Sequence, residues 1–272
     1  MCASTYDVHT LGNHKIENVL WFAMAVLTVL LISLGFGIRY AERRRRTTLV
    51  LLAALIAAWI GAWSGARLLN ALSIEVPGSE EKALVQAQNR WSLDGGLWAA
   101  LLVAYAVARR LGVDPYRIAD LAAPGVALGI AAARWGCFRQ GCCYGRPTTA
   151  PWGITVAWGS PAQQEHWSRN PFALFSGSPT IHPTQLYELT AALVIAAAAA
   201  IALIRVKVPA GLIAAGAWSA FAIWRLVNDA LRSPATLTLP WTIVLHVIAL
   251  LCGLLLLRHC LARELLVRPV DL

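Results

Sequence analysis

Charged side chains are scarce in this sequence, at 14% of its 272 residues, and acidic residues number only 14. A soluble globular domain usually carries about a quarter charged residues. The few charges are gathered in short islands between long apolar runs, and 58% of the chain is hydrophobic. This distribution excludes an ordinary soluble domain and predicts a membrane protein.

Long polar segments are also lacking, and the stretch 136–182 is the largest. Crossing a bilayer takes about 20 mostly apolar residues. Seven runs approach or exceed this length, namely 18–40, 48–72, 93–110, 119–135, 183–206, 209–227 and 239–257. We therefore expect an all-α polytopic membrane protein with about seven transmembrane helices. Residues 1–272 would form a single membrane domain, with a loop region at 136–182.

The first apolar run lacks the features of a cleavable signal peptide. Only Lys15 provides a basic residue before it, and no small-residue cleavage site follows it. The run ends instead in Arg39 and four arginines at 43–46, which is a stop-transfer pattern. We expect this run to remain as a helix.

The net charge of +9 does not indicate nucleic-acid binding, because the basic residues are placed in every second connection. They are Arg39 and residues 43–46; Arg109, Arg110 and Arg117; Arg205 and Lys207; and Arg258, Arg263 and Arg268. The positive-inside rule assigns such connections to the cytoplasm, where they face anionic headgroups. The pattern therefore predicts an outer N-terminus, a cytoplasmic C-terminus and an outward-facing loop region at 136–182.

Ionisable residues at two helix ends are candidates for a site, because such residues are expensive in a bilayer, at about 2.5–3.5 kcal/mol or more. Arg67, late in the second run, either reaches for the outer headgroups or faces a ligand. Asp94 opens the third run and either caps that helix or belongs to a ligand site. Gly95 and Gly96 follow it, and glycines allow a ligand to approach backbone amides at a helix start.

A second group lies at the end of the sixth run. Arg225, Asp229 and Arg232 are spaced i, i+4, i+7 and therefore share one helical face. They either form a structural ion pair or leave a surplus positive charge, since two arginines flank one carboxylate. A guanidinium binds phosphate oxygens in a bidentate manner, so this surplus suits a phosphate near the outer leaflet.

The densest polar stretch, residues 134–148, holds three arginines, three glycines and three cysteines. Its composition predicts an anion-binding loop at a helix end. Cys137, Cys142 and Cys143 favour either a disulfide or a functional thiol in an oxidising compartment. Their spacing matches no standard zinc pattern, and we expect no metal and no cofactor. His182 and Tyr187 open the fifth run beside Glu188, where they either line the site or only mark the membrane boundary.

Together these segments resemble the prolipoprotein diacylglyceryl transferase family. The resemblance rests on five ordered motifs: Gly65-Ala66-Arg67; Ser92-Leu93-Asp94-Gly95-Gly96; residues 134–148; residues 182–188; and Arg225 with Asp229 and Arg232. It implies an enzyme of the bacterial plasma (inner) membrane. That enzyme moves a diacylglyceryl group from phosphatidylglycerol to the thiol of a lipoprotein precursor and releases glycerol phosphate.

The resemblance also implies roles for individual residues. Arg134 and Arg225 would bind the lipid phosphate and stabilise charge on the leaving group, with Asp229 orienting Arg225. Asp94 and Cys137 occupy two further positions used for chemistry. The substrate-binding candidates are Arg67, Gly95, Gly96, Gly145, Arg146, His182, Tyr187 and Arg232.

Several positions depart from the family pattern. The family has His-Gly-Gly where this chain has Asp94-Gly95-Gly96, Asn in place of Cys137, and Glu in place of Asp229. Phe22 and Phe221 stand where the family has tyrosines. The parts that handle phosphate are kept and those that handle protons are changed, which favours a paralogue with altered chemistry.

Three functions follow from this pattern. The first is a transferase whose partners are a phospholipid donor, a thiol-bearing acceptor (a protein cysteine or a small thiol) and membrane lipids, with no nucleic acid. The second is a non-catalytic lipid- or anion-binding paralogue. The third is a membrane thiol-redox protein that uses Cys137, Cys142 and Cys143. For a transferase, we predict that Arg134 and Arg225 converge on one cavity open toward the outer leaflet, with Asp229 close to Arg225. Asp94 should line the same cavity, with Cys137 within reach of the bound headgroup.

Overall fold

The computed structural model of the chain describes residues 24, 27–39, 44–71, 93–139, 141–157, 160–169, 178–233 and 242–267. Each of the seven predicted runs contains a helix. These are Leu27–Arg39, α2 (Arg44–Ala71), α4 (Leu93–Arg110), α5 (Pro115–Arg139), α7 (Thr184–Arg205), α8 (Leu212–Leu231) and α9 (Thr242–Val267).

Four segments of the described chain are long and apolar enough to cross a membrane. They are Arg45–Leu68, Pro115–Arg139, Thr184–Arg205 and Ile243–Ala262. The predicted all-α polytopic class is therefore confirmed. The number of helices that cross, and the side on which each end lies, stay predictions.

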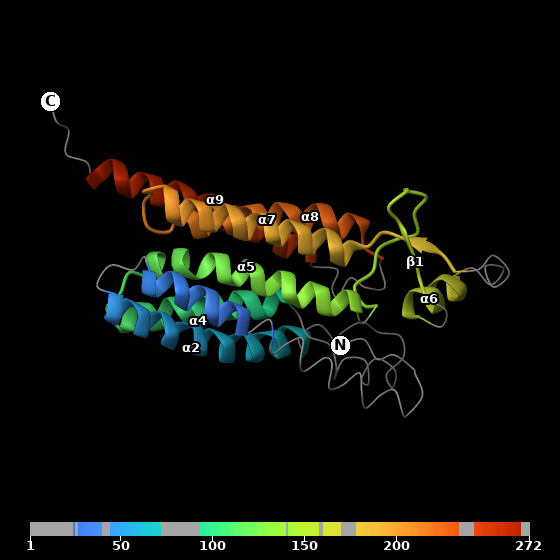
Figure 1. Cartoon of the computed structure of the whole chain (residues 1–272), viewed down its shortest axis with the longest axis horizontal. Helices are drawn as coiled ribbons and strands as arrows, with labels where there is room; N and C mark the ends of the chain where they lie inside the picture. Colours follow the sequence, from blue (N-terminus) through green and yellow to red (C-terminus); the bar gives the residue numbers. More distant parts are fainter. Residues whose placement is uncertain are drawn as a thin grey trace.

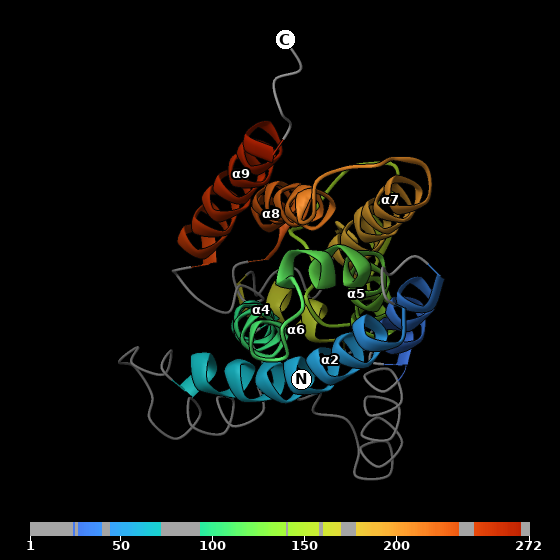
Figure 2. The ribbon, with the colours of Figure 1, turned by 90° about the vertical axis from the view of Figure 1, so that its left-hand side faces the viewer.

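Helix α5 lies in the middle of the molecule, between two groups of helices (Figures 1 and 2). On one side it packs against α7 and α8, and α8 in turn packs against α9. On its other side lie α2 and α4, which pack against each other along small residues. A Cβ at Gly65 would collide with Ala99 and the Gly95 carbonyl, so glycine is what allows the two helices to approach so closely.

The ends of α5 follow from local sequence signals. Asp114 accepts a hydrogen bond from the Tyr116 amide through Oδ1 at 3.0 Å, and Pro115 takes the first helical position. The helix therefore begins four residues before the predicted start at 119. It also continues past the predicted end at 135, so the first residues of the predicted loop region are helical.

The four basic connections lie at the same end of the bundle. Three contacts tie them together: Arg46 Nη2 donates to the Leu111 carbonyl at 3.1 Å, the Gly211 amide donates to Asp120 Oδ2 at 2.7 Å, and the Tyr116 and His259 rings lie 5.9 Å apart. A buried apolar cluster that includes Leu51 and Leu121 lies near this end. The connections that the charge pattern assigns to one side of the membrane therefore lie together at one end of the helical bundle.

The opposite end of the bundle carries a small element of two strands and a short helix. β1 (Ile154–Thr155) and β2 (Thr180–Ile181) pair antiparallel, with Ile154 opposite Ile181. α6 (Pro161–Arg169) lies beside them, at the same end of the bundle in Figure 1. The hydroxyl of Ser233, just after α8, donates to Glu165 of α6 at 2.6 Å, which attaches this element to the bundle.

Candidate functional site

Five ionisable side chains from four helices meet inside the bundle, away from the basic connections. Each is at least nine-tenths buried, with exposed fractions of 7% for Arg134, 1% for Glu188, 3% for Arg225, and 4% for both Asp229 and His246. Buried charges are stable only when they are paired and hydrogen-bonded. The geometry of the pairing therefore determines what this cluster can do.

Glu188 of α7 joins the two arginines that the sequence singled out. Its Oε1 lies 2.9 Å from Arg134 Nη2, and its Oε2 lies 3.0 Å from Arg225 Nη1. The Asn228 amide also donates to Oε2, at 3.3 Å. The two arginines therefore come together as predicted, and the residue that joins them is Glu188. That both line one cavity open toward the outer leaflet stays a prediction.

Asp229 forms the second acidic centre. Its Oδ1 lies 3.5 Å from Arg225 Nη1 and 3.3 Å from Arg232 Nη1, so the predicted i, i+4, i+7 grouping is present. Arg232 is already past the end of α8, in an extended conformation, yet it still reaches the carboxylate. Within this contacting set, three guanidiniums face two carboxylates, so the set has a surplus positive charge when His246 is neutral.

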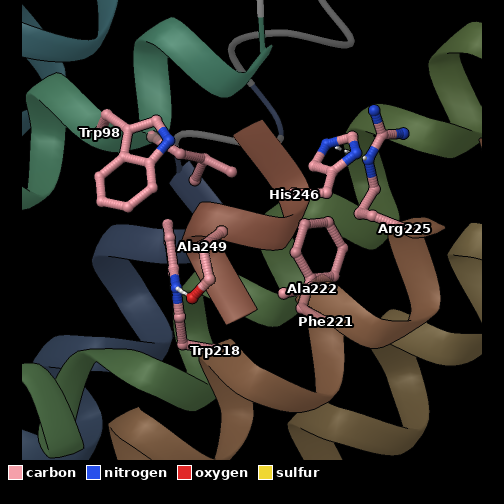
Figure 3. A pocket seen from close by; sticks show the side chains of 8 residues that line it. Trp98, Trp218, Phe221, Ala222, Arg225, His246 and Ala249 are labelled. Carbon is pink, nitrogen blue, oxygen red and sulfur yellow. Dashed lines mark hydrogen bonds between the residues drawn. The ribbon is translucent and has the colours of Figure 1, made fainter. Parts of the chain in front are cut away.

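His246 of α9 adds an imidazole to the same cluster. Its Nδ1 lies 3.1 Å from Asp229 Oδ2. Its Nε2 accepts a hydrogen bond from Arg225 Nε at 3.4 Å, and Figure 3 shows this second contact. These two contacts assign the proton of the neutral ring to Nδ1. A carboxylate that orients an imidazole in this way is the arrangement of a general base and its supporting acid.

A small cavity adjoins Arg225 and His246. Trp98 of α4 and Trp218 of α8 line it, with ring centroids 5.3 Å apart in an edge-to-face arrangement (Figure 3). Phe221 also lines it. The cavity is therefore apolar on one side and carries a guanidinium and an imidazole on the other, and at about 20 Å³ it has room for roughly one water molecule.

Sequence reasoning missed the central role of Glu188 and did not consider Asn228 or His246. The sequence places Glu188 only at a membrane boundary, beside His182 and Tyr187. His246 could have been found by the rule that identified the arginines, since it is an ionisable residue inside an apolar run. Asn228 precedes Asp229 and gives no comparable signal in the sequence.

Several predicted binding residues lie outside the buried cluster. Arg67 is exposed, with its guanidinium 5.5 Å from the Trp63 ring centroid. Gly96 packs against the Ala62 carbonyl of α2, and Gly95 lies in the same helix contact. Asp94 belongs to α4, but its side chain lies outside the described part, so its predicted place in the site stays a prediction. Phe22 is likewise outside the described residues.

Gly145 and Arg146 pass between the start of α7 and the end of α8. The Gly145 amide donates to the His182 carbonyl at 3.0 Å, and the Arg146 amide donates to the Leu231 carbonyl at 2.9 Å. A Cβ at Gly145 would collide with the His182 backbone, so no other residue fits there without displacement. Arg146 is exposed and donates from Nε to the Arg232 carbonyl at 3.1 Å.

His182 and Tyr187 contact each other rather than the arginines. His182 Nδ1 and the Tyr187 hydroxyl lie 3.1 Å apart, and both side chains are half-buried. The predicted role of both residues in substrate binding stays a prediction.

Three thiols lie beside Arg134. The sulfur atoms of Cys137, Cys142 and Cys143 are all within 4.8 Å of one another, and Arg134 Nη1 lies 3.9 Å from Cys137 Sγ. Cys137 is therefore next to the cluster, and its predicted reach to a bound headgroup stays a prediction. Hydrogen bonds from the thiols of Cys137 and Cys142 hold the pKa of Cys143 well below its usual range, and Arg232 and Arg134 act in the same direction while burial opposes them.

The fold and the buried cluster define a multi-pass membrane protein with an internal arginine–carboxylate site. Residues 11–259 match the model of the prolipoprotein diacylglyceryl transferase family, and the chain belongs to this family. The match covers most of the chain and includes every residue of the cluster.

Curated relatives carry the name phosphatidylglycerol–prolipoprotein diacylglyceryl transferase. The chain is 35% identical to the Frankia alni protein over 138 residues, which are 49% of this chain and 33% of the relative. It is 28% identical to the Trichormus variabilis protein over 174 residues, 63% of this chain and 58% of the relative. The aligned stretches thus cover between a third and three fifths of these relatives.

Proposed function

We propose that this protein is a transferase that moves a diacylglyceryl group from phosphatidylglycerol to a thiol acceptor, such as a prolipoprotein cysteine. The family membership and the names of the relatives support this activity. The observation that carries it is the pairing of Arg134 and Arg225 with one carboxylate, Glu188, because this pairing aligns two guanidiniums at one place in the bundle.

The reaction breaks one bond and forms one bond. The acceptor sulfur attacks the glyceryl carbon that bears the phosphate, and a C–S bond forms as the C–O bond breaks. The electron pair of the broken bond stays on the phosphate oxygen, so glycerol phosphate leaves as an anion. The thiol proton must pass to a base, because the thiolate is the nucleophile.

The guanidiniums act on the leaving group. A phosphate that displaces part of the Glu188 pairing receives bidentate hydrogen bonds from Arg134 and Arg225, and Asp229 keeps Arg225 in place. Donors oriented before the reaction stabilise charge that develops in the transition state, and removal of one such donor typically costs about 10²–10³ in kcat. Cys137, 3.9 Å from Arg134, acts as a positioning residue for that guanidinium.

His246 is the base that this mechanism favours. Asp94 stands where the family has histidine, and a carboxylate with an ordinary pKa of about 3.9 is a weak base for a thiol. His246 Nε2 can receive the proton once Arg225 turns toward the phosphate, and Asp229 stabilises the imidazolium that results. In this mechanism His246 on α9 takes the role of the histidine that the family has at the start of the third predicted helix, where this chain has Asp94.

The acceptor approaches from the water-exposed end. An open cleft of about 340 Å³ lies between α6 and the segment after the cysteines, lined by Tyr144, Arg146, Glu165, His166 and Ser233 among others. It begins one residue after Cys143 in the chain. In a bacterial inner membrane with the basic connections in the cytoplasm, this cleft faces outward, where lipoprotein precursors emerge.

The test uses the full chain in vesicles that contain phosphatidylglycerol labelled in its acyl chains, with a cysteine-containing acceptor peptide. Mass spectrometry should detect a thioether between the peptide and diacylglycerol, together with glycerol phosphate. His246→Gln should lower kcat and remove the acidic limb of the pH–rate profile, where protonation of the base stops the reaction, while leaving lipid binding intact. Lipid retained by the protein without any thioether would instead support the binding paralogue.

A further inference from the structure

The three thiols beside Arg134 are brought together by backbone geometry rather than by chance proximity. Gly141 has a φ of +65° and ends α5. Its amide donates to the Phe138 carbonyl at 3.1 Å, and the Cys142 amide donates to the Cys137 carbonyl at 3.1 Å. This pair of bonds is a Schellman motif, in which the residue after the glycine folds back on the last turn of the helix. It places Cys142 against Cys137.

Cys143 completes the group through an unusual backbone conformation. Its φ of +59° is uncommon for a residue other than glycine, and it makes Cys143 the only such non-glycine position among the described residues. A left-handed residue reverses the direction of its side chain relative to an extended one, and the Cys143 sulfur lies within 4.8 Å of the other two.

The turn is also fixed from outside. Thr184 Oγ1 donates to the Cys143 carbonyl at 2.7 Å, and Gln185 Nε2 donates to the Cys142 carbonyl at 2.5 Å. Both donors come from the first turn of α7, and both residues are buried. Two helices therefore hold the cysteine backbone in place, so the positions of the three sulfurs are largely set before any ligand binds.

We propose that Cys137, Cys142 and Cys143 form a binding site for a soft, thiophilic metal ion, with Cu(I) as the best match. Thiolates select Cu(I) and Zn²⁺ among biological metals. At a metal–sulfur bond of about 2.3 Å, three sulfurs around one ion stand roughly 4 Å apart, so a small inward movement suffices. Cu(I) is satisfied by three sulfur ligands, whereas Zn²⁺ takes four ligands and requires a water at the fourth position.

The charges around the site agree with this proposal. The bound ion is held by three thiolates, and any thiol proton displaced passes to solvent, so the Cu(I) complex carries two negative charges and the Zn²⁺ complex carries one. Arg134 lies 3.9 Å from Cys137 Sγ and offsets part of this charge. The linear spacing of the cysteines predicted no metal site, because the Schellman motif and the left-handed Cys143 are not visible in a spacing pattern.

The test is a metal titration of the full chain, reduced and purified in detergent without oxygen. Cu(I) is supplied as its bicinchoninate complex, and transfer to the protein is followed by loss of the chelator colour. Wild type should take one Cu(I) per chain. Loss of an outer-shell partner typically costs roughly 10–100-fold in metal affinity, so Cys143→Ser and Cys137→Ser should cost at least about 100-fold. Cys252→Ser, on α9, is the matched control and should bind as wild type does.

A second measurement needs no variant. Maleimide mass-tagging of wild type should show three fewer reactive thiols after Cu(I) addition, which decides the matter even if a serine variant fails to fold. The same tagging measurement with Zn²⁺ identifies the ion. Protection of the three thiols by Zn²⁺ but not by Cu(I) would support a metal site at these cysteines and show that Zn²⁺ occupies it. Unchanged Cu(I) affinity in Cys143→Ser, no protection by either ion, or a disulfide that joins Cys137 to a neighbour and resists reductant would overturn the proposal.

Discussion

At the residue scale, Glu188 holds the site together because it pairs with guanidiniums from two different helices. Glu188→Gln keeps the shape of the side chain and removes its charge, which leaves two buried arginines with one compensating carboxylate. Removing one partner of a buried pair costs about 3–5 kcal/mol. We expect a large fall in the thermal stability of the detergent-solubilised protein, measured by tryptophan fluorescence.

The matched control for this change is Glu165→Gln. Glu165 lies on α6, is only half-buried, and accepts a hydrogen bond from Ser233 that a glutamine oxygen can also accept. Its replacement should leave thermal stability near that of wild type. Equal effects at positions 165 and 188 would mean that the buried pairing does not stabilise the fold.

A lysine should not be able to replace Arg225 without loss of activity. Arg225 contacts Glu188 and Asp229 through Nη1 and His246 through Nε, and a single ammonium group cannot reproduce that set. Arg225→Lys should therefore lower the rate of diacylglyceryl transfer by about 100-fold or more. Arg205→Lys, at the exposed end of α7, is the control and should leave the rate unchanged.

The site could be predicted only in part at this scale. Arg134, Arg225 and Asp229 are recognisable because charge in an apolar run is costly, and the i, i+4 spacing places two of them together. That Arg134 meets Glu188, and that Asp229 meets His246, depends on how separate helices pack. The periodicity of side chains along one helix does not indicate which residues of another helix they contact.

At the element scale, the segment around Gly145 connects the small element formed by β1, β2 and α6 to the ends of α7 and α8. Gly145→Ala should disturb this crossing, because the added Cβ would collide with the His182 backbone and crowd the Leu231 carbonyl. Overpacking of this kind typically costs about 1–3 kcal/mol. The expected result is a lower melting temperature and faster proteolysis within residues 141–182.

Gly216→Ala provides the comparison for that change. Gly216 lies inside α8, and a Cβ there would meet nothing within 4 Å. Alanine is the better helix former by up to about 1 kcal/mol, so this variant should be as stable as wild type or more stable. A Gly145→Ala protein that behaves like the Gly216→Ala protein would show that the close backbone approach is not needed.

Element boundaries show where sequence reasoning reached its limit. The helices themselves were predicted from their apolar runs, but α5 extends at both ends beyond its run. Asp114 and Pro115 set its start, and Gly141 sets its stop, so its bounds follow from capping rather than from hydropathy. For the same reason residues 134–139 are helical, although their composition suggested a loop.

At the scale of the whole molecule, the predicted orientation can be measured directly. In a background without native cysteines, Trp152→Cys should react with a membrane-impermeant maleimide added to intact cells, because residue 152 is exposed at the outer end. Lys207→Cys, at the basic end, should react only after the membrane is permeabilised. Labelling in the reverse order would contradict the orientation inferred from the positive-inside rule.

The pairing of charges from α5, α7, α8 and α9 has a consequence for biogenesis. During synthesis α5 enters the membrane before Glu188 of α7 has been made, and Asp229 precedes the arrival of His246. Each nascent intermediate therefore holds a charge or polar group whose partner is still in the ribosome, and only the last helix completes the set. We expect a chain that stops at residue 241 to be degraded rather than to accumulate, and pulse–chase measurement of its half-life beside the full chain will show whether this is so.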